Sequence, residues 1–497
     1  MESRTLEPCV RGGYPRRGPT VSVASEDRTF RQERERVTVT IRNRDELLDG
    51  AEPALRADAI DIVDSALAAV VPERLLAEVL ARTDDCVTID GQRYDLASID
   101  DVFVVGVGKG SGALTSAVLR RLDGVTEAII VEKDASTVDP EVIDRFGDAL
   151  AVLEAGHPIP TEASQRAAER VLGLAERAGA DDLVVCCLTG GTSALLSAPD
   201  GVDLEAIARV TEALLRAGAP IEELNAVRTH LSEIKGGRLA ERLAPATVVS
   251  LIVVDEVAGE PWGPTAPNAS TYADALDVVD RYDIEASVPP TVRERLERGA
   301  AGERSETLDR DAIAGLPVRN VVIADASDVC LAAADEARKR GYEPLVLSTR
   351  IEGEAGEVGR VHAGIGIDVV EDGRPLEPPM ALVTGGETTV TVGEEAGSGG
   401  PNQETALGFA EKIGGWPGIV GAFVGTDGTD GPTDLAGGLA TGQTRSRATA
   451  AGVPIADALE RNDAAGTLTE LDDAIVTGPT ATNLMDLRVV LVDDAAE

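Results

Sequence analysis

The sequence is poor in aromatic residues. Phe, Trp and Tyr make up 2% of its 497 residues, whereas hydrophobic residues of all kinds make up 43%. The hydrophobic cores must therefore be built from Ala, Val, Leu and Ile, which favours helices packed on sheets over an aromatic-rich β-sandwich. A chain of this length can form two or three domains, each with a core of its own.

Positive charge is also scarce. The chain carries 87 acidic against 46 basic residues, a net charge of −41. We interpret this acidity, with arginine in place of lysine, as adaptation of a halophile's protein to a high-salt cytoplasm. At molar salt the Debye length is about 3 Å, so the repulsion between the acidic side chains is tolerable. An ordinary acidic protein is the alternative. Such a surface argues against nucleic acid or an anionic membrane as partner. The scarcity makes each lysine a candidate functional residue: Lys109, Lys133, Lys235, Lys339 and Lys412.

Long apolar runs and cysteine motifs are absent as well. No apolar run reaches the roughly 18 residues of a membrane-spanning helix. The five cysteines show neither CxxC spacing nor a disulfide framework. Arg16 and Arg17 are not followed by an apolar segment, so a twin-arginine export signal is not expected. We therefore expect a cytoplasmic protein.

Two α/β lobes are the simplest interpretation of the remaining pattern. Residues 1–40 lack periodicity and are expected to be a disordered leader, or the product of a start codon placed too far upstream. Thereafter short buried strands alternate with amphipathic helices, which is typical of a parallel sheet covered on both faces. We expect a larger Rossmann-like domain over 45–285, a connection over 286–317 and a smaller C-terminal α/β domain over 318–497, with a cleft between the domains.

The stretch VFVVGVGKGSG (102–112) is a strand that runs into a glycine-rich turn. The dinucleotide fingerprint would need glycine where Ser111 stands, and the P-loop would need glycine at 103 and Ser or Thr at 110. What remains is a strand end, a helix N-terminus and a lysine, which together favour an anion site at Gly108 and Lys109. A plain tight turn is the alternative.

A second glycine turn, CCLTGGTSALLSAP (186–199), repeats this construction at the carboxyl end of another buried strand, where α/β proteins bind ligands. The G-x-S-x-G pattern is absent and the chain has only three histidines, which disfavours a serine nucleophile with a histidine base. Anion binding is the favoured role for Gly190, Gly191, Thr192 and Ser193.

Cationic residues gather in NAVRTHLSEIKGGRLA (225–240). Arg228 and Lys235 could hold a carboxylate or a phosphate. Ion pairing on a helix surface is the alternative. His230 is expected to be a packed or capping histidine.

Acidic and amide side chains follow buried strands or begin a helix. Asp255 ends the predicted strand 246–255, and a glycine-rich loop over 425–438 carries three more aspartates. Acids at strand ends near anion sites suit Mg²⁺ held between protein and nucleotide phosphates. The candidates for the ion are Asp255 and Asp427. Asp430 and, at the start of a predicted helix, Asn402, Gln403 and Glu404 are candidates to bind substrate or phosphate; Asp434 is interpreted as a solvated loop charge.

Taken together, these motifs resemble the MOFRL-type glycerate 2-kinases. The matching segments occur in order from about residue 50 to the C-terminus: VGVGKG, GHPIPTEAS, LTGGTSALL, NAVRTHLSEIKGGRLA, GGETTVTV, NQE, GTDGTDGPTD and TGPTATNLMDLRVVL. The resemblance implies ATP-dependent phosphorylation of the 2-hydroxyl of D-glycerate with Mg²⁺. It places Lys109, Asp255 and Asp427 on the active-site lysine and aspartates, the two aspartates also as metal ligands, and it places Glu387 and Asn483 among the substrate- or phosphate-binding residues.

Two departures from the family pattern affect the acceptor site. Pro401 stands where the family usually has an arginine before NQE, and Arg228 is our candidate replacement. Glu256 and Glu260 are candidates to replace acids of the 254–270 region. An NAD(P)H-dependent hydroxypyruvate reductase is the alternative enzyme, disfavoured by the missing third glycine. A kinase for another sugar acid, a non-catalytic sugar-acid-binding protein and a homodimer are further alternatives that the sequence leaves open.

Overall fold

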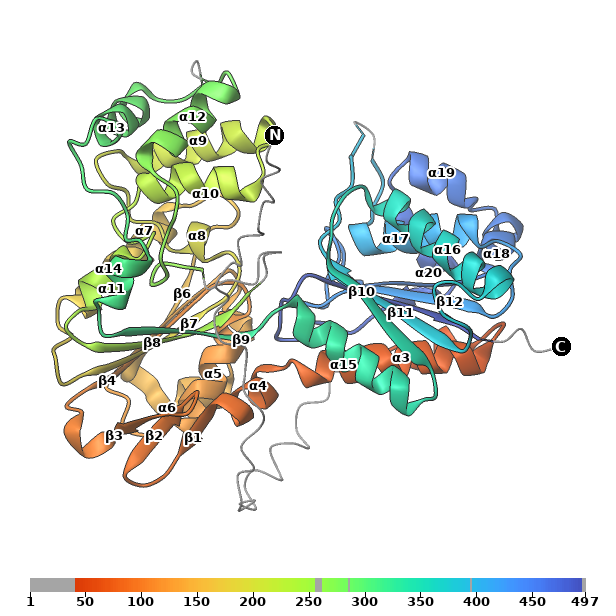
Figure 1. Cartoon of the computed structure of the whole chain (residues 1–497), viewed down its shortest axis with the longest axis horizontal. Helices are drawn as coiled ribbons and strands as arrows, with labels where there is room; N and C mark the ends of the chain where they lie inside the picture. Colours follow the sequence, from red (N-terminus) through yellow and green to blue (C-terminus); the bar gives the residue numbers. More distant parts are fainter. Residues whose placement is uncertain (1–40, 255–261, 285–286, 394–395, 494–497) are drawn as a thin grey trace, which may run out of the picture. The chain divides into compact units, whose positions relative to one another are not determined.

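The computed structural model describes residues 41–254, 262–284, 287–393 and 396–493, which form two lobes, each built on a six-stranded sheet (Figure 1). The predicted leader over 1–40 lies outside this range. The two-lobe α/β fold class is confirmed. None of the described helices is both long and apolar enough to cross a membrane.

The sheet of the first lobe is entirely parallel. Its strands are β4 (Val102–Val107), β5 (Glu127–Glu132), β6 (Leu150–Glu154), β7 (Leu183–Leu188), β8 (Thr247–Val253) and β9 (Val318–Ala324). Their order is β6-β5-β4-β7-β8-β9, which is the Rossmann order. The winding direction reverses between β4 and β7, and ligands of such sheets bind outside the carboxyl ends of the strands at this switch point.

Helices cover both faces of this sheet because its strands are apolar on both sides. Val104 of β4 packs in the core that contains α5 (Ser111–Arg121), whereas Phe103 and Val105 pack with α7 (Glu162–Ala175). The lobe also contains α4 (Pro72–Val79), α6 (Pro140–Phe146), α8 (Thr192–Leu195), α11 (Arg238–Leu243) and a small antiparallel sheet of β1 (Leu80–Arg82), β2 (Cys86–Ile89) and β3 (Gln92–Asp95).

A helical layer with its own core extends the first lobe. It consists of α9 (Leu204–Arg216), α10 (Ile221–His230), α12 (Tyr272–Arg281), α13 (Pro290–Ala300) and, following them, α14 (Arg310–Ala314). The connection expected over 286–317 therefore contains two helices, α13 and α14. Val292 and Leu296, four residues apart on α13, are buried against α9 and α12, which explains why this charged segment folds as a helix.

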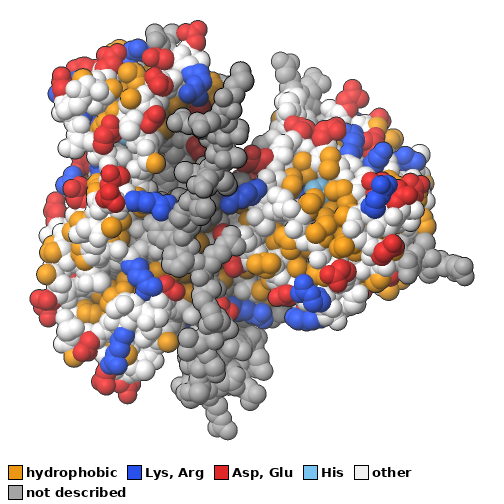
Figure 2. All heavy atoms as spheres, viewed as in Figure 1, with side chains coloured by type: hydrophobic (Ala, Val, Ile, Leu, Met, Phe, Trp, Pro, Cys, Tyr) orange, Lys and Arg blue, Asp and Glu red, His pale blue; other side chains and the backbone are white. Residues whose placement is uncertain are grey.

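The sheet of the second lobe is mixed. Its order is β10-β11-β15-β12-β13-β14, with one parallel pair, β10 and β11. The strands are β10 (Glu343–Ile351), β11 (Met380–Gly386), β12 (Ile419–Gly425), β13 (Gly437–Thr441), β14 (Ala474–Ile475) and β15 (Asp486–Val492). On the side of β10, hydrophobic side chains gather on the surface (Figure 2), and a groove of about 470 Å³ opens there beside Leu345, Leu347 and Ile365.

Helices cover both faces of the second sheet as well. One face packs against α16 (Ala355–Asp372) and α17 (Pro401–Lys412), the other against α3 (Pro53–Ala69) and α15 (Ala326–Lys339). The shorter helices are α2 (Arg44–Leu48), α18 (Thr444–Ala451), α19 (Ile455–Glu460) and α20 (Ala464–Glu470).

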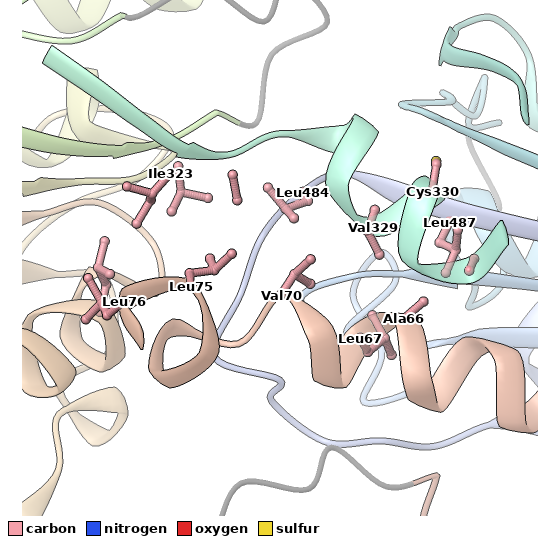
Figure 3. Packing of buried hydrophobic residues seen from close by; sticks show 14 of the residues in the cluster. Ala66, Leu67, Val70, Leu75, Leu76, Ile323, Val329, Cys330, Leu484 and Leu487 are labelled. Atoms are coloured by element: carbon pink, nitrogen blue, oxygen red, sulfur yellow. The ribbon is translucent and has the colours of Figure 1, made fainter. Parts of the chain in front are cut away.

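The boundaries of the lobes differ from the expected domain boundaries. Strand β9, expected to begin the C-terminal domain, is the edge strand of the first sheet. Helix α3, expected in the N-terminal domain, packs on the second sheet, where the buried Arg56 pairs with Asp473 at 3.0 Å. One hydrophobic core runs from Leu76 beside the first sheet to Leu487 in the second (Figure 3).

Candidate functional site

The two glycine turns predicted to bind anions lie side by side at the switch point, at the ends of β4 and β7. The backbone N–H of Lys109 donates to the carbonyl of Gly190 at 2.7 Å, and that of Thr189 donates to Val107 at 3.0 Å. The buried hydroxyl of Thr192 donates to the Val107 carbonyl at 2.8 Å. These bonds make the two turns one rigid unit.

Gly108 allows this close approach. Its φ is +129°, a conformation that favours glycine, and a Cβ here would lie 2.2 Å from the carbonyl oxygen of Thr189. The turn thus places the half-buried Lys109 directly beyond the end of β4.

The N-terminus of α5, which follows this turn, is already occupied by a carboxylate of the protein. Glu132, at the end of β5, accepts hydrogen bonds from the N–H of Gly112 at 3.0 Å and the hydroxyl of Ser111 at 3.4 Å. Burial raises the pKa of Glu132, and these backbone hydrogen bonds oppose the rise. An anion at this turn would therefore meet the side chain of Lys109, because these first groups of α5 are engaged.

Strand direction brings a second set of polar residues together in the other lobe. Strand β15 runs antiparallel to β11 and β12, so its first residue, Asp486, pairs with Gly386 and Gly425, the last residues of those strands. Glu387 and Asp427, which follow β11 and β12, consequently lie at the same edge of the sheet as Asp486.

A pocket of about 160 Å³ unites this edge with Lys109. Its lining contains Lys109, Glu387, Thr388, Pro401, Asn402, Gly425, Asp427, Thr429, Asp430, Gly431, Asn483, Met485 and Asp486. Six of the site residues predicted from the sequence are therefore in one place: Lys109, Glu387, Asn402, Asp427, Asp430 and Asn483.

Hydrogen bonds hold the carboxylates of this pocket in fixed positions. The side-chain amide of Asn402 donates to Asp430 at 3.1 Å and to Asp486 at 2.7 Å. Asp430 also accepts the backbone N–H groups of Asn402 and Gln403, and so caps α17. Burial, with a smaller contribution from the nearby charge of Asp486, raises the pKa of Asp430 to about 6. Asp486 in turn is bonded to the buried Arg488.

Asp427 is held by its own loop. Its Oδ1 accepts the N–H of Thr429 at 2.9 Å and the Thr429 hydroxyl at 3.1 Å. The backbone N–H of Thr480, from the loop before β15, donates to the carbonyl of Asp427. Two loops distant in sequence thereby support the same side of the pocket.

The donor set fits a divalent ion held only partly by protein. The described part of the chain has no cluster of three or more His, Cys, Asp or Glu side chains arranged around a metal position. The pocket nevertheless presents several carboxylates, and the buried Oδ1 of Asn402 has no hydrogen-bond partner among the described residues. One or two carboxylates completed by phosphate oxygens and water are typical of Mg²⁺ sites.

Lys235 and Thr192, both predicted to bind an anion, instead support the fold. The ammonium group of Lys235 donates to the carbonyls of Ser193 at 2.6 Å and Leu196 at 3.0 Å, at the end of α8. Burial, together with the smaller effect of the Arg228 charge, lowers the pKa of Lys235 to about 7. The sequence could not reveal that carbonyl groups would take up this ammonium.

Gln403 and Glu404 also have partners away from the pocket. The side-chain amide of Gln403 donates to the Asp430 carbonyl at 3.1 Å and to Thr433 at 3.0 Å, and Glu404 accepts from Asn462 at 2.9 Å. The predictions for Asp255, Glu256 and Glu260 concern positions outside the described residues.

Thr388, Asp486 and His157 are among the residues of this region that sequence reasoning missed. Asp486 carries the same signal as Asp427, an acid where a loop meets a buried strand, and could have been found. His157 lies near the glycine turns, where the charges of Lys109, Lys133 and Arg228 act on it. Arg228 itself donates to Asn225 at 2.7 Å.

Comparisons with known proteins agree with this architecture. Residues 58–297 match the model of a domain of unknown function, DUF4147, and residues 380–486 match the MOFRL family. A glycerate 2-kinase of Pyrococcus horikoshii is 36% identical over 88% of this chain and 97% of its own. A protein of Agrobacterium vitis, provisionally named a hydroxypyruvate reductase, is 38% identical over 78% of this chain and 86% of its own. The crystal structure of a glycerate kinase from Thermotoga maritima superposes with a TM-score of 0.74 at 35% identity, covering 88% of this chain and 99% of that one.

Proposed function

The chain belongs to the MOFRL-type glycerate 2-kinase family, and on this basis we propose that it transfers the γ-phosphoryl group of ATP to the 2-hydroxyl of D-glycerate, giving 2-phosphoglycerate and ADP. The observation that carries the proposal is the pocket in which Lys109, at the switch point of the first lobe, meets Asp427 and Asp430 of the second. Phosphoryl transfer depends on such positioning and charge neutralisation more than on covalent chemistry.

We assign different roles to the residues in and around the pocket: charge neutralisation, ion binding and binding of the acceptor. Lys109 neutralises negative charge on the phosphoryl group in transfer. Asp427, and Asp255 by resemblance, either bind Mg²⁺ or accept the proton of the attacking hydroxyl. Mg²⁺, when bound with the nucleotide, supplies positive charge to the phosphate oxygens. Arg228, in place of the arginine missing at Pro401, and the Gly190–Gly191 turn bind the carboxylate of the acceptor.

The acidic composition indicates the cellular environment in which this activity would take place. With a net charge of −41, the protein is suited to the cytoplasm of a cell with high internal salt, and a homodimer is compatible with this proposal.

ADP release in the presence of ATP, Mg²⁺ and a series of hydroxy acids tests the proposal. D-Glycerate should give the largest release, and ³¹P and ¹³C NMR should identify 2-phosphoglycerate. Hydroxypyruvate with NADH serves as the control for the reductase, and no loss of absorbance at 340 nm is expected because Ser111 interrupts the dinucleotide fingerprint. NADH oxidation without ADP release would refute the kinase assignment.

A further inference from the structure

His157 is the histidine that the fold leaves uncommitted. The buried His230 and His362 are bonded through their ring nitrogens, His230 to the Ala226 carbonyl at 2.6 Å and His362 to Thr384 at 2.8 Å. His157 is half-buried, and within the described ranges no hydrogen bond joins its ring to another residue. Its ring nitrogens are therefore available to a ligand.

The imidazole of His157 and the side chain of Lys109 border the same space, next to Gly191. Its Nε2 and Cδ2 atoms are 3.2 and 3.0 Å from the point where a Cβ on Gly191 would stand, and Cγ of Lys109 is 3.3 Å from the same point. The missing side chain of Gly191, with its φ of +83°, is what admits both groups to the turn. His157 thus sits at the switch point, next to the side chain that reaches the pocket.

Three cations act electrostatically on His157: Lys109 of the β4–α5 turn, Lys133 after β5, and Arg228 of α10. Burial first, and then these three charges, lower the pKa of His157 to about 4. The imidazole is consequently neutral at physiological pH and has one nitrogen that can accept a proton. In a chain with a net charge of −41, three cations around one neutral base mark a place for an anionic ligand.

An anionic substrate would change the base strength of this histidine. A bound carboxylate and phosphate would offset the charges of Lys109, Lys133 and Arg228, so the pKa of His157 would rise in the complex. The imidazole would then become a stronger base when the anionic substrates are bound. This matches the requirement that a general base have a pKa near the working pH.

We propose that His157 is a catalytic residue that contacts the acceptor and takes the proton of its attacking hydroxyl; this rests on the proposed kinase function. The O–H bond of the acceptor breaks and its proton moves to the free ring nitrogen. The hydroxyl oxygen forms a bond to the γ-phosphorus, and the bond from that phosphorus to the bridging oxygen breaks, leaving its electron pair on ADP. The proton passes to solvent when the products leave.

His157→Gln, which keeps hydrogen-bonding capacity but no basic nitrogen, tests the proposal, with His157→Ala as the second variant. We expect kcat to fall about 100-fold or more in both, as for loss of a general base, and the acid limb of the wild-type kcat profile to disappear. The KM values for ATP and D-glycerate should change much less. A role in structure alone would leave the pH profile of the remaining activity unchanged.

Histidine ¹⁵N NMR of the wild-type protein measures the protonation of His157 directly, without relying on activity. The chain has three histidines, and the His157→Gln spectrum identifies the signal of His157. We expect this signal to remain that of neutral imidazole from pH 8 to pH 5 in the free protein. With D-glycerate, Mg²⁺ and a non-hydrolysable ATP analogue, its titration midpoint should move up into this range.

Two failures would have different meanings. Normal turnover of the His157→Gln enzyme with an unchanged pH profile would overturn the assignment of His157 as base and leave an aspartate in that role, with the kinase function intact. Absence of ADP release by the wild-type protein with every hydroxy acid would overturn the kinase function and this proposal together.

Discussion

Replacing Lys109 by methionine would isolate the contribution of a single ammonium group. The backbone N–H of Lys109, which bonds to Gly190 at 2.7 Å, is unaffected by the substitution. The methionine side chain can also retain the packing of the lysine stem against Gly191. The positive charge that lines the pocket opposite Asp427 and Asp430 is what the variant loses.

The expected effect is large. Two unit charges about 4 Å apart interact by about 4 kcal/mol at an effective dielectric constant of 20. Loss of one preorganised donor to a transition-state oxyanion costs about 3–4 kcal/mol, or roughly 10²–10³-fold in kcat. We therefore expect kcat/KM of the Lys109→Met enzyme to fall by roughly 10²–10³-fold while its thermal unfolding midpoint stays close to that of wild type.

An ADP-coupled assay with D-glycerate measures this effect. Lys339→Met is the matched control, since Lys339 has an exposed side chain that pairs with Glu336 on the surface of α15, and its activity should stay within about twofold of wild type because exposed pairs contribute little. A folded Lys109→Met enzyme with turnover close to wild type would refute the role of this lysine and the reasoning that places the site at the switch point.

Two further predictions concern the turns beneath the site. Gly108→Ala should lower the free energy of unfolding by about 2–5 kcal/mol, because the alanine would have to keep a left-handed φ and its Cβ would overlap Thr189. Urea unfolding measures this change. The control is Gly173→Ala in α7, where a Cβ meets open space; it should be neutral or stabilising. Equal stability of the two variants would contradict the close packing of the turns. Lys235 has a folded-state pKa of about 7 against its usual 10.5, so the unfolded chain binds more protons between these values, and its contribution makes stability rise with pH over that window. Urea unfolding from pH 6.5 to pH 10 should show a smaller rise for Lys235→Met, and an identical slope would show that Lys235 is not buried as described.

The structural features that depend on local sequence pattern could be predicted from the sequence. Alternating buried strands and helices were sufficient for the α/β lobes, and acids directly after buried strands located Asp427 and Asp430. It could not predict which sheet an amphipathic helix covers, because the apolar face of α3 would suit either one. It also could not distinguish a lysine that lines a pocket from one whose ammonium group caps a helix. Lys109 and Lys235 have similar sequence surroundings of glycine, yet only the folded chain shows that carbonyls surround the second.

Strand β9 belongs to the first lobe and helix α3 to the second, and this affects how the protein can be divided into fragments. The two family matches, over 58–297 and 380–486, suggest fragments that could be produced separately. The first fragment would lack its edge strand and carry a helix whose apolar side has no sheet to cover. The second would expose the surface that α3 and α15 shield. Such halves should aggregate when expressed alone, and soluble material should be recovered only when both are co-expressed with the omitted segments restored.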